Sequence, residues 1–249
     1  MNSYTCFAEF YDKLMAEDFN YSHIADYVEN VFDAYSVDAN LVCELACGTG
    51  NITIPLAKRG YDMIAVDNSY DMLDIARKKA SSLCDNNILF LNQNMTSVDL
   101  YGTVDAFICL VDGINYILNP YSLYKMFKKI KTCFLEPDGI FIFDISSEHK
   151  LKNVIGNNTF IHDGSDVFYS WENRYIESKR MSDMYLNFFV QNKNGSYRRF
   201  SERHLQRACG LKEIEAIVRK AGFKKADIYD GMSFNNAHEE SERIVFVVR

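Results

Sequence analysis

Short apolar runs alternate with longer amphipathic segments through the first 150 residues, and this alternation limits the possible folds more than any other feature. Strands are expected over residues 41–45, 62–67, 88–94, 104–111 and 139–146. Helices are expected over residues 22–35, 48–59 and 122–135, and from Ser69 onward. Pro55 lies inside the second of these helices, where it predicts a local distortion. Nearly continuous apolar strands that alternate with helices predict a parallel sheet covered on both faces.

The pattern changes after about residue 150. Residues 165–177 and 183–191 alternate between polar and apolar side chains, and Asn194-Gly195 predicts a turn into a third strand at 196–204. A helix over 211–223 and two more strands complete the chain. We therefore expect a doubly wound α/β fold with a seven-stranded, mostly parallel sheet. Residues 1–150 and 205–249 form it, and residues 151–204 are an inserted antiparallel β-ribbon.

The segment L-V-C-E-L-A-C-G-T-G-N, residues 41–51, joins a strand to a helix through a tight turn that contains glycine. Small residues in such a turn let a ligand approach the backbone, and the first N–H groups of the helix are unpaired donors. Asp67 ends the next strand, 17 positions after Gly50. An acid at about that distance suits the hydroxyls of a ribose. The segment therefore predicts a nucleoside cofactor at the carboxyl ends of the strands.

Two kinds of nucleoside cofactor use this geometry. A dinucleotide site requires G-x-G-x-x-G, and with Gly48 and Gly50 as its first two glycines the third falls at Thr53. A side chain at Thr53 hinders close packing of helix on strand, and Glu44 places a negative charge near a diphosphate. A sulfonium cofactor with an ammonium group suits that acid. The residues therefore favour S-adenosylmethionine over NAD.

Five segments, in order, resemble those of class I S-adenosylmethionine-dependent methyltransferases. E-L-A-C-G-T-G (44–50) resembles motif I, with Ala46 in place of the first glycine. V-D-N-S-Y-D-M-L (66–73), Q-N-M (93–95) and L-V-D-G-I-N-Y (110–116) resemble the ribose, adenine and methyl-flanking segments, and the chain ends like the family's antiparallel hairpin. The opening, with Y-D-K-L-M (11–15), resembles a small bacterial subgroup that is similar to glycine N-methyltransferase.

This resemblance implies the Rossmann-like methyltransferase fold and a set of site residues. It implies that Asp67 binds the ribose, that Met72 lines the adenine and that Asn94 meets the adenine edge. The full set of expected cofactor-binding residues is Tyr11, Glu44, Ala46, Cys47, Gly48, Gly50, Asp67, Asn68, Met72, Asn94, Met95, Leu110 and Asp112. Methyl transfer from a sulfonium is an in-line displacement that requires no metal. Its main demand is correct positioning of the acceptor.

A general base is needed only if the acceptor arrives protonated, and Tyr116 and His204 are the candidates. Arg207 lies close to His204 in the chain, and we interpret it either as a connector held by an ion pair or as a residue that contacts the substrate. The ribbon over 151–204 is expected to be a lid that selects the substrate. Cys47 and Cys109 are interpreted as small apolar residues rather than nucleophiles.

Composition and missing motifs narrow the range of methyl acceptors. The 27 basic and 34 acidic residues give a net charge of −7, which disfavours nucleic acid as the main partner. The segment 110–116 lacks the Asn/Asp-Pro-Pro-Tyr/Phe motif of amino methyltransferases that act on nucleic acids, and the Pro-Cys of cytosine C5 enzymes. We expect a small-molecule acceptor, methylated on nitrogen or oxygen. A tRNA or protein acceptor and a non-catalytic cofactor-binding protein remain alternatives. The missing third glycine disfavours an NAD-dependent oxidoreductase.

The cysteines and apolar runs predict the compartment. The seven cysteines form no C-x-x-C pair, so reduced thiols in a cytoplasm are expected. No apolar run approaches the roughly 20 residues of a membrane helix, and the first residues do not resemble a signal peptide. The expected protein is therefore cytoplasmic and not bound to a membrane.

Overall fold

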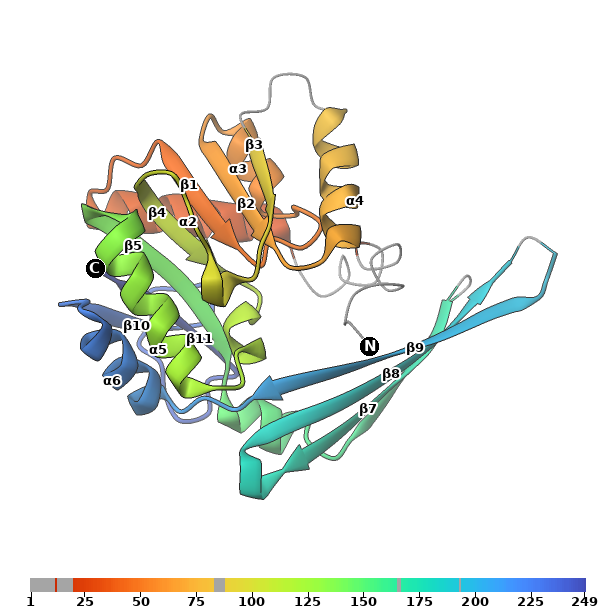
Figure 1. Cartoon of the computed structure of the whole chain (residues 1–249). Helices are drawn as coiled ribbons and strands as arrows, with labels where there is room; N and C mark the ends of the chain where they lie inside the picture. The colour runs from red at the N-terminus through yellow and green to blue at the C-terminus, as the bar shows by residue number, and fades with distance from the viewer. Residues whose placement is uncertain (1–11, 13–19, 83–87, 165–166, 193) are drawn as a thin grey trace.

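A seven-stranded sheet forms the main body of the computed structural model, which describes residues 12, 20–82, 88–164, 167–192 and 194–249 (Figure 1). Its strands are β1 (Leu41–Leu45), β2 (Asp62–Asp67), β3 (Ile88–Asn92), β4 (Val104–Cys109), β5 (Leu135–Ser146), β10 (Ala226–Asp230) and β11 (Arg243–Val248). They lie in the order β10-β11-β5-β4-β1-β2-β3. β11 runs antiparallel to both of its neighbours, and the other pairings are parallel. The predicted fold class is confirmed.

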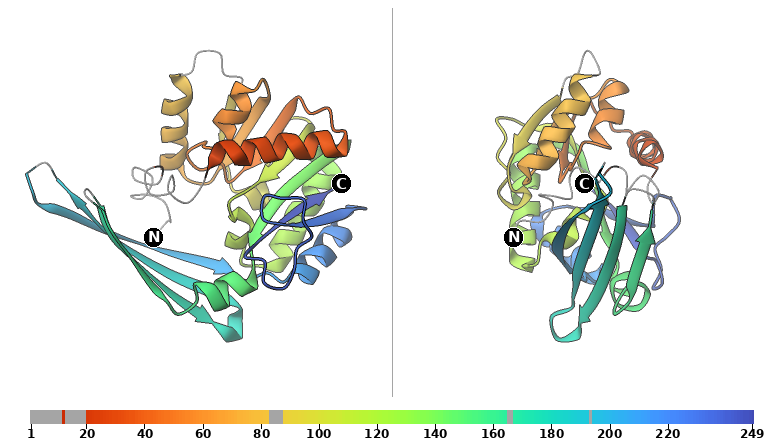
Figure 2. Two further views of the ribbon diagram at one scale, coloured as in Figure 1. Left: turned by 180° about the vertical axis from the view of Figure 1, so that it is seen from behind. Right: turned by 90° about the vertical axis from the view of Figure 1, so that its right-hand side faces the viewer.

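Helices cover both faces of this sheet (Figures 1 and 2). One face packs against α2 (Tyr21–Tyr35), α3 (Thr53–Lys58) and α4 (Tyr70–Ser81). The other packs against α5 (Pro120–Lys129) and α6 (Leu211–Ala221). Phe127 of α5, fully buried, contacts the rings of Phe141 and Phe143 on β5. No helix within the described ranges is long and apolar enough to cross a membrane.

Two helices differ from their predicted limits. The helix expected from Gly48 begins at Thr53, so Pro55 lies in its first turn. The first N–H groups of a helix have no partner within it, so proline there breaks no hydrogen bond, and the expected distortion was wrong. The helix expected over 122–135 ends at Lys129, and one π-helical turn, Ile130–Phe134, leads directly into β5. A register shift in the pairing of β4 with β5 accommodates the residues before Ile140.

A second, antiparallel sheet follows β5. It contains β6 (Thr159–Asp163), β7 (Val167–Ile176), β8 (Met181–Gln191) and β9 (Tyr197–Arg207). β7, β8 and β9 correspond to the three predicted strands and run together as a long ribbon away from the main sheet (Figures 1 and 2). β6 was not predicted, because its side chains are nearly all exposed and show no alternating burial.

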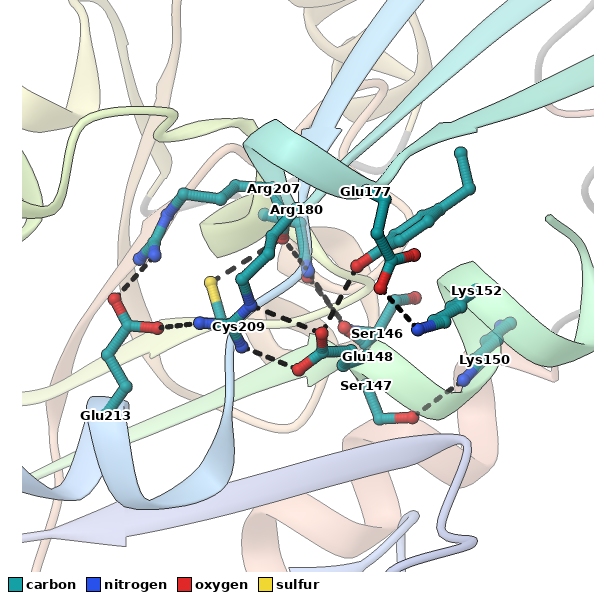
Figure 3. Close-up of polar contacts among 12 residues, drawn as sticks. Ser146, Ser147, Glu148, Lys150, Lys152, Glu177, Arg180, Arg207, Cys209 and Glu213 are labelled. Carbon is teal, nitrogen blue, oxygen red and sulfur yellow. Dashed lines mark hydrogen bonds and ion pairs between the residues drawn. The ribbon is translucent and has the colours of Figure 1, made fainter.

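Ion pairs hold the base of the second sheet against the main body (Figure 3). Arg180, between β7 and β8, donates to Glu148 at 2.6 Å, and Glu148 lies just after β5. Glu213 of α6 pairs with Arg207 at the end of β9, also at 2.6 Å, and with Arg180 at 3.4 Å. The structure therefore shows Arg207 as a connector in an ion pair. These contacts fix where the ribbon leaves the main body.

Candidate active site

A cavity of about 780 Å³ lies at the carboxyl ends of β1, β2 and β4. The chain fills the sheet outward from β1 to β3 and then returns to β4 on the other side of β1, so the strand order reverses at this place. Ligands of open α/β sheets bind at such a reversal, and the cavity has the volume of a small-ligand site. The chain therefore places this cavity where the sequence predicted a cofactor.

The turn after β1 holds three residues in left-handed backbone conformations. Ala46, Gly48 and Gly50 have φ of 54°, 55° and 78°. A Cβ at Gly48 would meet nothing within 4 Å, because this residue faces the cavity. A Cβ at Gly50 would lie 3.3 Å from the Cβ of Ala76 on α4. Gly48 therefore leaves space for a ligand, whereas Gly50 lets the turn pack against α4.

Asp67 connects this turn to the start of α4. Its Oδ2 accepts the Gly48 N–H at 2.8 Å, and its Oδ1 accepts the Ser69 N–H at 2.7 Å. Ser69 in turn caps α4 by accepting the N–H of Met72. Burial raises the pKa of Asp67, and the backbone donors oppose that shift. The carboxylate lines the cavity while two backbone donors hold it in place.

Glu44 is an acid at the cavity wall that is only 2% exposed. Burial raises its pKa from 4.5 to about 8, although the Thr53 hydroxyl donates a hydrogen bond to its carboxylate. Thr53, the position that argued against a dinucleotide, is the first residue of α3, and it is fully buried. Sequence reasoning missed this partner, because only the tertiary structure brings the two side chains together.

The loop after β4 is held in a left-handed conformation at two consecutive residues, Val111 and Asp112, with φ of 64° and 53°. The carboxylate of Asp112 accepts from Arg243 at 2.9 Å and from Gln206 at 3.0 Å, and its N–H donates to Asp144 at 2.7 Å. Burial acts to raise the pKa of Asp112, but nearby positive charge, with Arg243 foremost, lowers it below its usual value. Asp112 therefore anchors the loop, and its side chain does not line the cavity.

Tyr116 and His204 meet at the edge of the cavity, although 88 positions separate them in the chain. Tyr116 ends the 3₁₀ turn Gly113–Tyr116 and lines the cavity, and its hydroxyl lies 3.1 Å from Nδ1 of His204 on β9. The rings meet edge to face, with their centroids 6.0 Å apart. The structure thus joins the two residues that sequence reasoning selected independently as candidate bases.

Most of the other predicted site residues also line the cavity: Glu44, Ala46, Cys47, Gly48, Asp67, Asn68, Met72, Asn94, Met95 and Leu110. Gly50, Asp112 and His204 do not line it, and Tyr11 lies outside the described residues. Asn94 accepts hydrogen bonds from the N–H and hydroxyl of Thr96. Burial raises the thiol pKa of Cys47 and of Cys109, as expected of inert residues.

Several lining residues had not been selected from the sequence: Tyr21, Thr49, Asn51, Gln93 and Val111. All except Tyr21 are within two positions of a predicted site residue, which is the signal that could have found them. The described lining contains Glu44, Asp67 and Asp71 but no lysine, arginine or histidine. Such a wall suits a cationic ligand and opposes a diphosphate.

Comparison with known proteins decides the family. Residues 42–139 match the family model for a methyltransferase domain. The chain is 32% identical over 245 residues to YqeM of Bacillus subtilis, whose name describes it as an inferred methyltransferase. The match covers 98% of this chain and 95% of YqeM. It is 33% identical to an S-adenosylmethionine-dependent methyltransferase from Clostridium acetobutylicum, whose crystal structure matches with a TM-score of 0.90 over 100% of this chain and 99% of the other.

The chain belongs to the class I S-adenosylmethionine-dependent methyltransferases. The fold of this methyltransferase also matches CalS10 of Micromonospora echinaspora, an amino pentose methyltransferase solved with S-adenosylmethionine. That match has 19% identity and a TM-score of 0.76 over 100% of this chain and 98% of CalS10. S-adenosylmethionine is the cofactor of this methyltransferase, and the acidic cavity wall fits its positive charges.

We expect alanine at Gly48 and alanine at Gly50 to impair the methyltransferase in different ways. Gly50→Ala combines a left-handed φ with a close contact to α4, so it should lower the free energy of unfolding by roughly 1–3 kcal/mol. A Cβ at Gly48 has open space around it, so Gly48→Ala should lower the free energy of unfolding by about 1–2 kcal/mol, from the left-handed φ alone. Its methyl group should weaken cofactor binding at least about tenfold, because it fills part of the cavity. Urea unfolding and calorimetric titration check the two effects, and equal binding losses would contradict the assignment.

Proposed function

We propose that this methyltransferase moves the methyl group of S-adenosylmethionine to a nitrogen or oxygen atom of a small molecule. In the proposed complex, Asp67 binds the ribose hydroxyls and Glu44 faces the ammonium group. Met72, Asn94 and Met95 surround the adenine, and Gly48 lets the cofactor approach the turn. The position of these residues around one cavity supports the assignment.

The observation that carries the proposal is the hydrogen bond between Tyr116 and His204 at the cavity wall. A hydroxyl and an imidazole in contact can hold an N–H or O–H acceptor and take up its proton. The positive sulfur of the cofactor already makes a good leaving group, so the remaining task is to align the acceptor and exclude water. Correct positioning alone can supply about 7–11 kcal/mol.

We further propose that residues 151–204 form an inserted lid and substrate region, and that Tyr11 belongs to the site, as in the glycine N-methyltransferase-like subgroup. The ion pairs at the base of the second sheet support the first point, because they hold β7–β9 beside the site. CalS10, which shares the fold, is named an amino pentose methyltransferase. An amino pentose is a small molecule, and this supports a small acceptor here. Cys43, Cys47, Cys109, Cys133 and Cys209 are all free, which supports the cytoplasmic location that we propose.

A tRNA acceptor is the second candidate, and it rests on Arg198 and Arg199, both exposed near the tip of β9. We weigh it below a small molecule because the cavity wall is acidic and a phosphate backbone requires positive charge.

The experiment that tests the proposal measures release of S-adenosylhomocysteine with four acceptor samples. These are glycine, an amino-sugar nucleotide, a fraction of small metabolites and bulk tRNA, each incubated with methyl-labelled cofactor. We expect release and label transfer with at least one of the small-molecule samples. Label in tRNA alone would reverse the order of the two candidates. Cofactor binding without release in any sample would favour a non-catalytic binding protein.

A further inference from the structure

We propose that Glu202, His204 and Tyr116 form a proton relay, in which Glu202 is a positioning residue that makes His204 the final proton acceptor. The proposal rests on the proposed function and names its substrate class. The acceptor is one that arrives with a proton to lose, namely an alcohol, a phenol or an ammonium group.

The backbone of β9 places Glu202 and His204 on the same face, because side chains two apart in a strand point the same way. Oε2 of Glu202 lies 3.2 Å from Nε2 of His204. The other ring nitrogen, Nδ1, lies 3.1 Å from the hydroxyl of Tyr116. The imidazole therefore sits between a carboxylate and a phenol, and the phenol lines the cofactor cavity.

Burial makes this arrangement selective for one tautomer. His204 is 2% exposed and Glu202 is 8% exposed. Since a carboxylate accepts hydrogen bonds, it favours the neutral ring with its proton on Nε2, and this leaves the lone pair of Nδ1 for the Tyr116 O–H.

The neighbouring residues on β8 and β9 are apolar or bound elsewhere. Across β8, Met184 pairs with His204 and Leu186 pairs with Glu202, so both partners there are apolar. Gln206, next on the same face of β9, donates to Asp112 of the loop after β4. Glu202 is thus the carboxylate in contact with the ring, and Tyr116 is its contact toward the cavity.

In the proposed step, an alcohol or phenol acceptor X–H attacks with a lone pair of X, which forms the bond to the methyl carbon, and the carbon–sulfur bond breaks with its electron pair left on sulfur. An ammonium acceptor has no lone pair, so it gives its proton to the relay before the displacement. As X loses its proton to the oxygen of Tyr116, the phenolic proton passes to Nδ1 of His204. The products are methylated X, S-adenosylhomocysteine and an imidazolium that faces Glu202. The imidazolium later returns its proton to solvent.

The relay distinguishes acceptor classes. A neutral amine already offers a lone pair and gains little from a base during the displacement. An alcohol, a phenol or an ammonium group has to lose a proton, and a positioned base contributes about 10²–10⁴-fold to such a step. We therefore expect the relay to serve an acceptor of this second group.

Glu202→Gln tests the relay, because glutamine keeps the size of the side chain but removes the charge that faces Nε2 of His204. With the acceptor sample that supports release of S-adenosylhomocysteine, we expect kcat to fall about 10–100-fold and the KM for S-adenosylmethionine to stay within about twofold. Adding Glu202→Gln to His204→Asn should cause little further loss, since residues that act as a unit are not additive. Glu239→Gln, an exposed position between β10 and β11, is the matched control and should leave kcat unchanged.

Nitrogen-15 NMR of the histidine rings tests the same relay without any acceptor. We expect the neutral His204 ring to carry its proton on Nε2 in the wild type and to lose that strong preference in Glu202→Gln. A proton on Nδ1, or a wild-type kcat in Glu202→Gln, would overturn the relay and leave methyl transfer intact. Failure of the wild type to release S-adenosylhomocysteine with any sample would instead reject the proposed function, and the NMR result would still decide the ring's tautomer.

Discussion

Asp67→Ala should abolish the stabilisation of this methyltransferase by S-adenosylmethionine. The Asp67 carboxylate accepts backbone N–H groups from the Gly48 turn and from the start of α4, so it holds these two segments together. It also faces the cavity. The substitution removes the proposed ribose contact and loosens the turn together. We expect at least a hundredfold loss of affinity, about 2.7 kcal/mol.

Thermal unfolding with and without the cofactor measures this loss. At 100 times its dissociation constant, the cofactor should raise the Tm of the wild type by roughly 5–10 °C. At the same concentration the Tm of Asp67→Ala should move by about 1 °C or less. Asp62→Ala is the control, because Asp62 is exposed at the opposite end of β2. A full shift in Asp67→Ala would remove Asp67 from the proposed cofactor site.

Glu44→Gln should stabilise the cofactor-free protein and weaken cofactor binding, two effects of opposite sign. Burial raises the pKa of Glu44 to about 8, whereas the unfolded chain releases this proton near pH 4.5. Between these values the unfolded state binds fewer protons than the folded state, so this group lowers stability as pH rises. Above about pH 8 its penalty is constant. Glutamine removes that penalty, so its stabilising effect should grow from pH 5 to pH 8.

Binding of the cofactor should show the reverse dependence. Below pH 8 the wild type has to release the Glu44 proton in order to pair with the cofactor's ammonium group, so its affinity should rise from pH 6 to pH 8. In Glu44→Gln we expect an affinity about 10–100-fold lower at pH 8, with this rise absent. Calorimetric titration at three pH values measures both, and Glu240→Gln, which is exposed, is the control. An unchanged affinity at pH 8 would contradict the proposed contact between Glu44 and the ammonium group.

The strand–turn–helix at 41–51 could be recognised from sequence because its requirements are local. A turn that holds three left-handed residues selects small side chains, and an acid that ends the next strand is found by counting. Alternating polar and apolar residues over β7 and β8, with the Asn194-Gly195 turn before β9, revealed the second sheet for the same reason, whereas the nearly fully exposed β6 left no pattern to detect.

The side-chain partners in the site depend on segments that are far apart in the chain. Asp112 stands in a segment that resembles a cofactor loop, yet Arg243 and Gln206, more than 90 positions away, hold its carboxylate outside the cavity lining. No local pattern encodes those contacts. Likewise, sequence reasoning could choose Tyr116 and His204 as candidate bases but could not place one against the other.

The sequence by itself determined the fold class, the order of the main-sheet strands along the chain and the glycine turn after β1, because backbone conformation and alternating burial are imposed residue by residue. Only the tertiary structure decided that Glu44 is buried against Thr53 and that Asp112 serves the loop rather than the cavity. It also decided that Glu202 and Tyr116 flank the same imidazole. The physical reason is that electrostatic environment and hydrogen-bond partners belong to the packed assembly of distant segments.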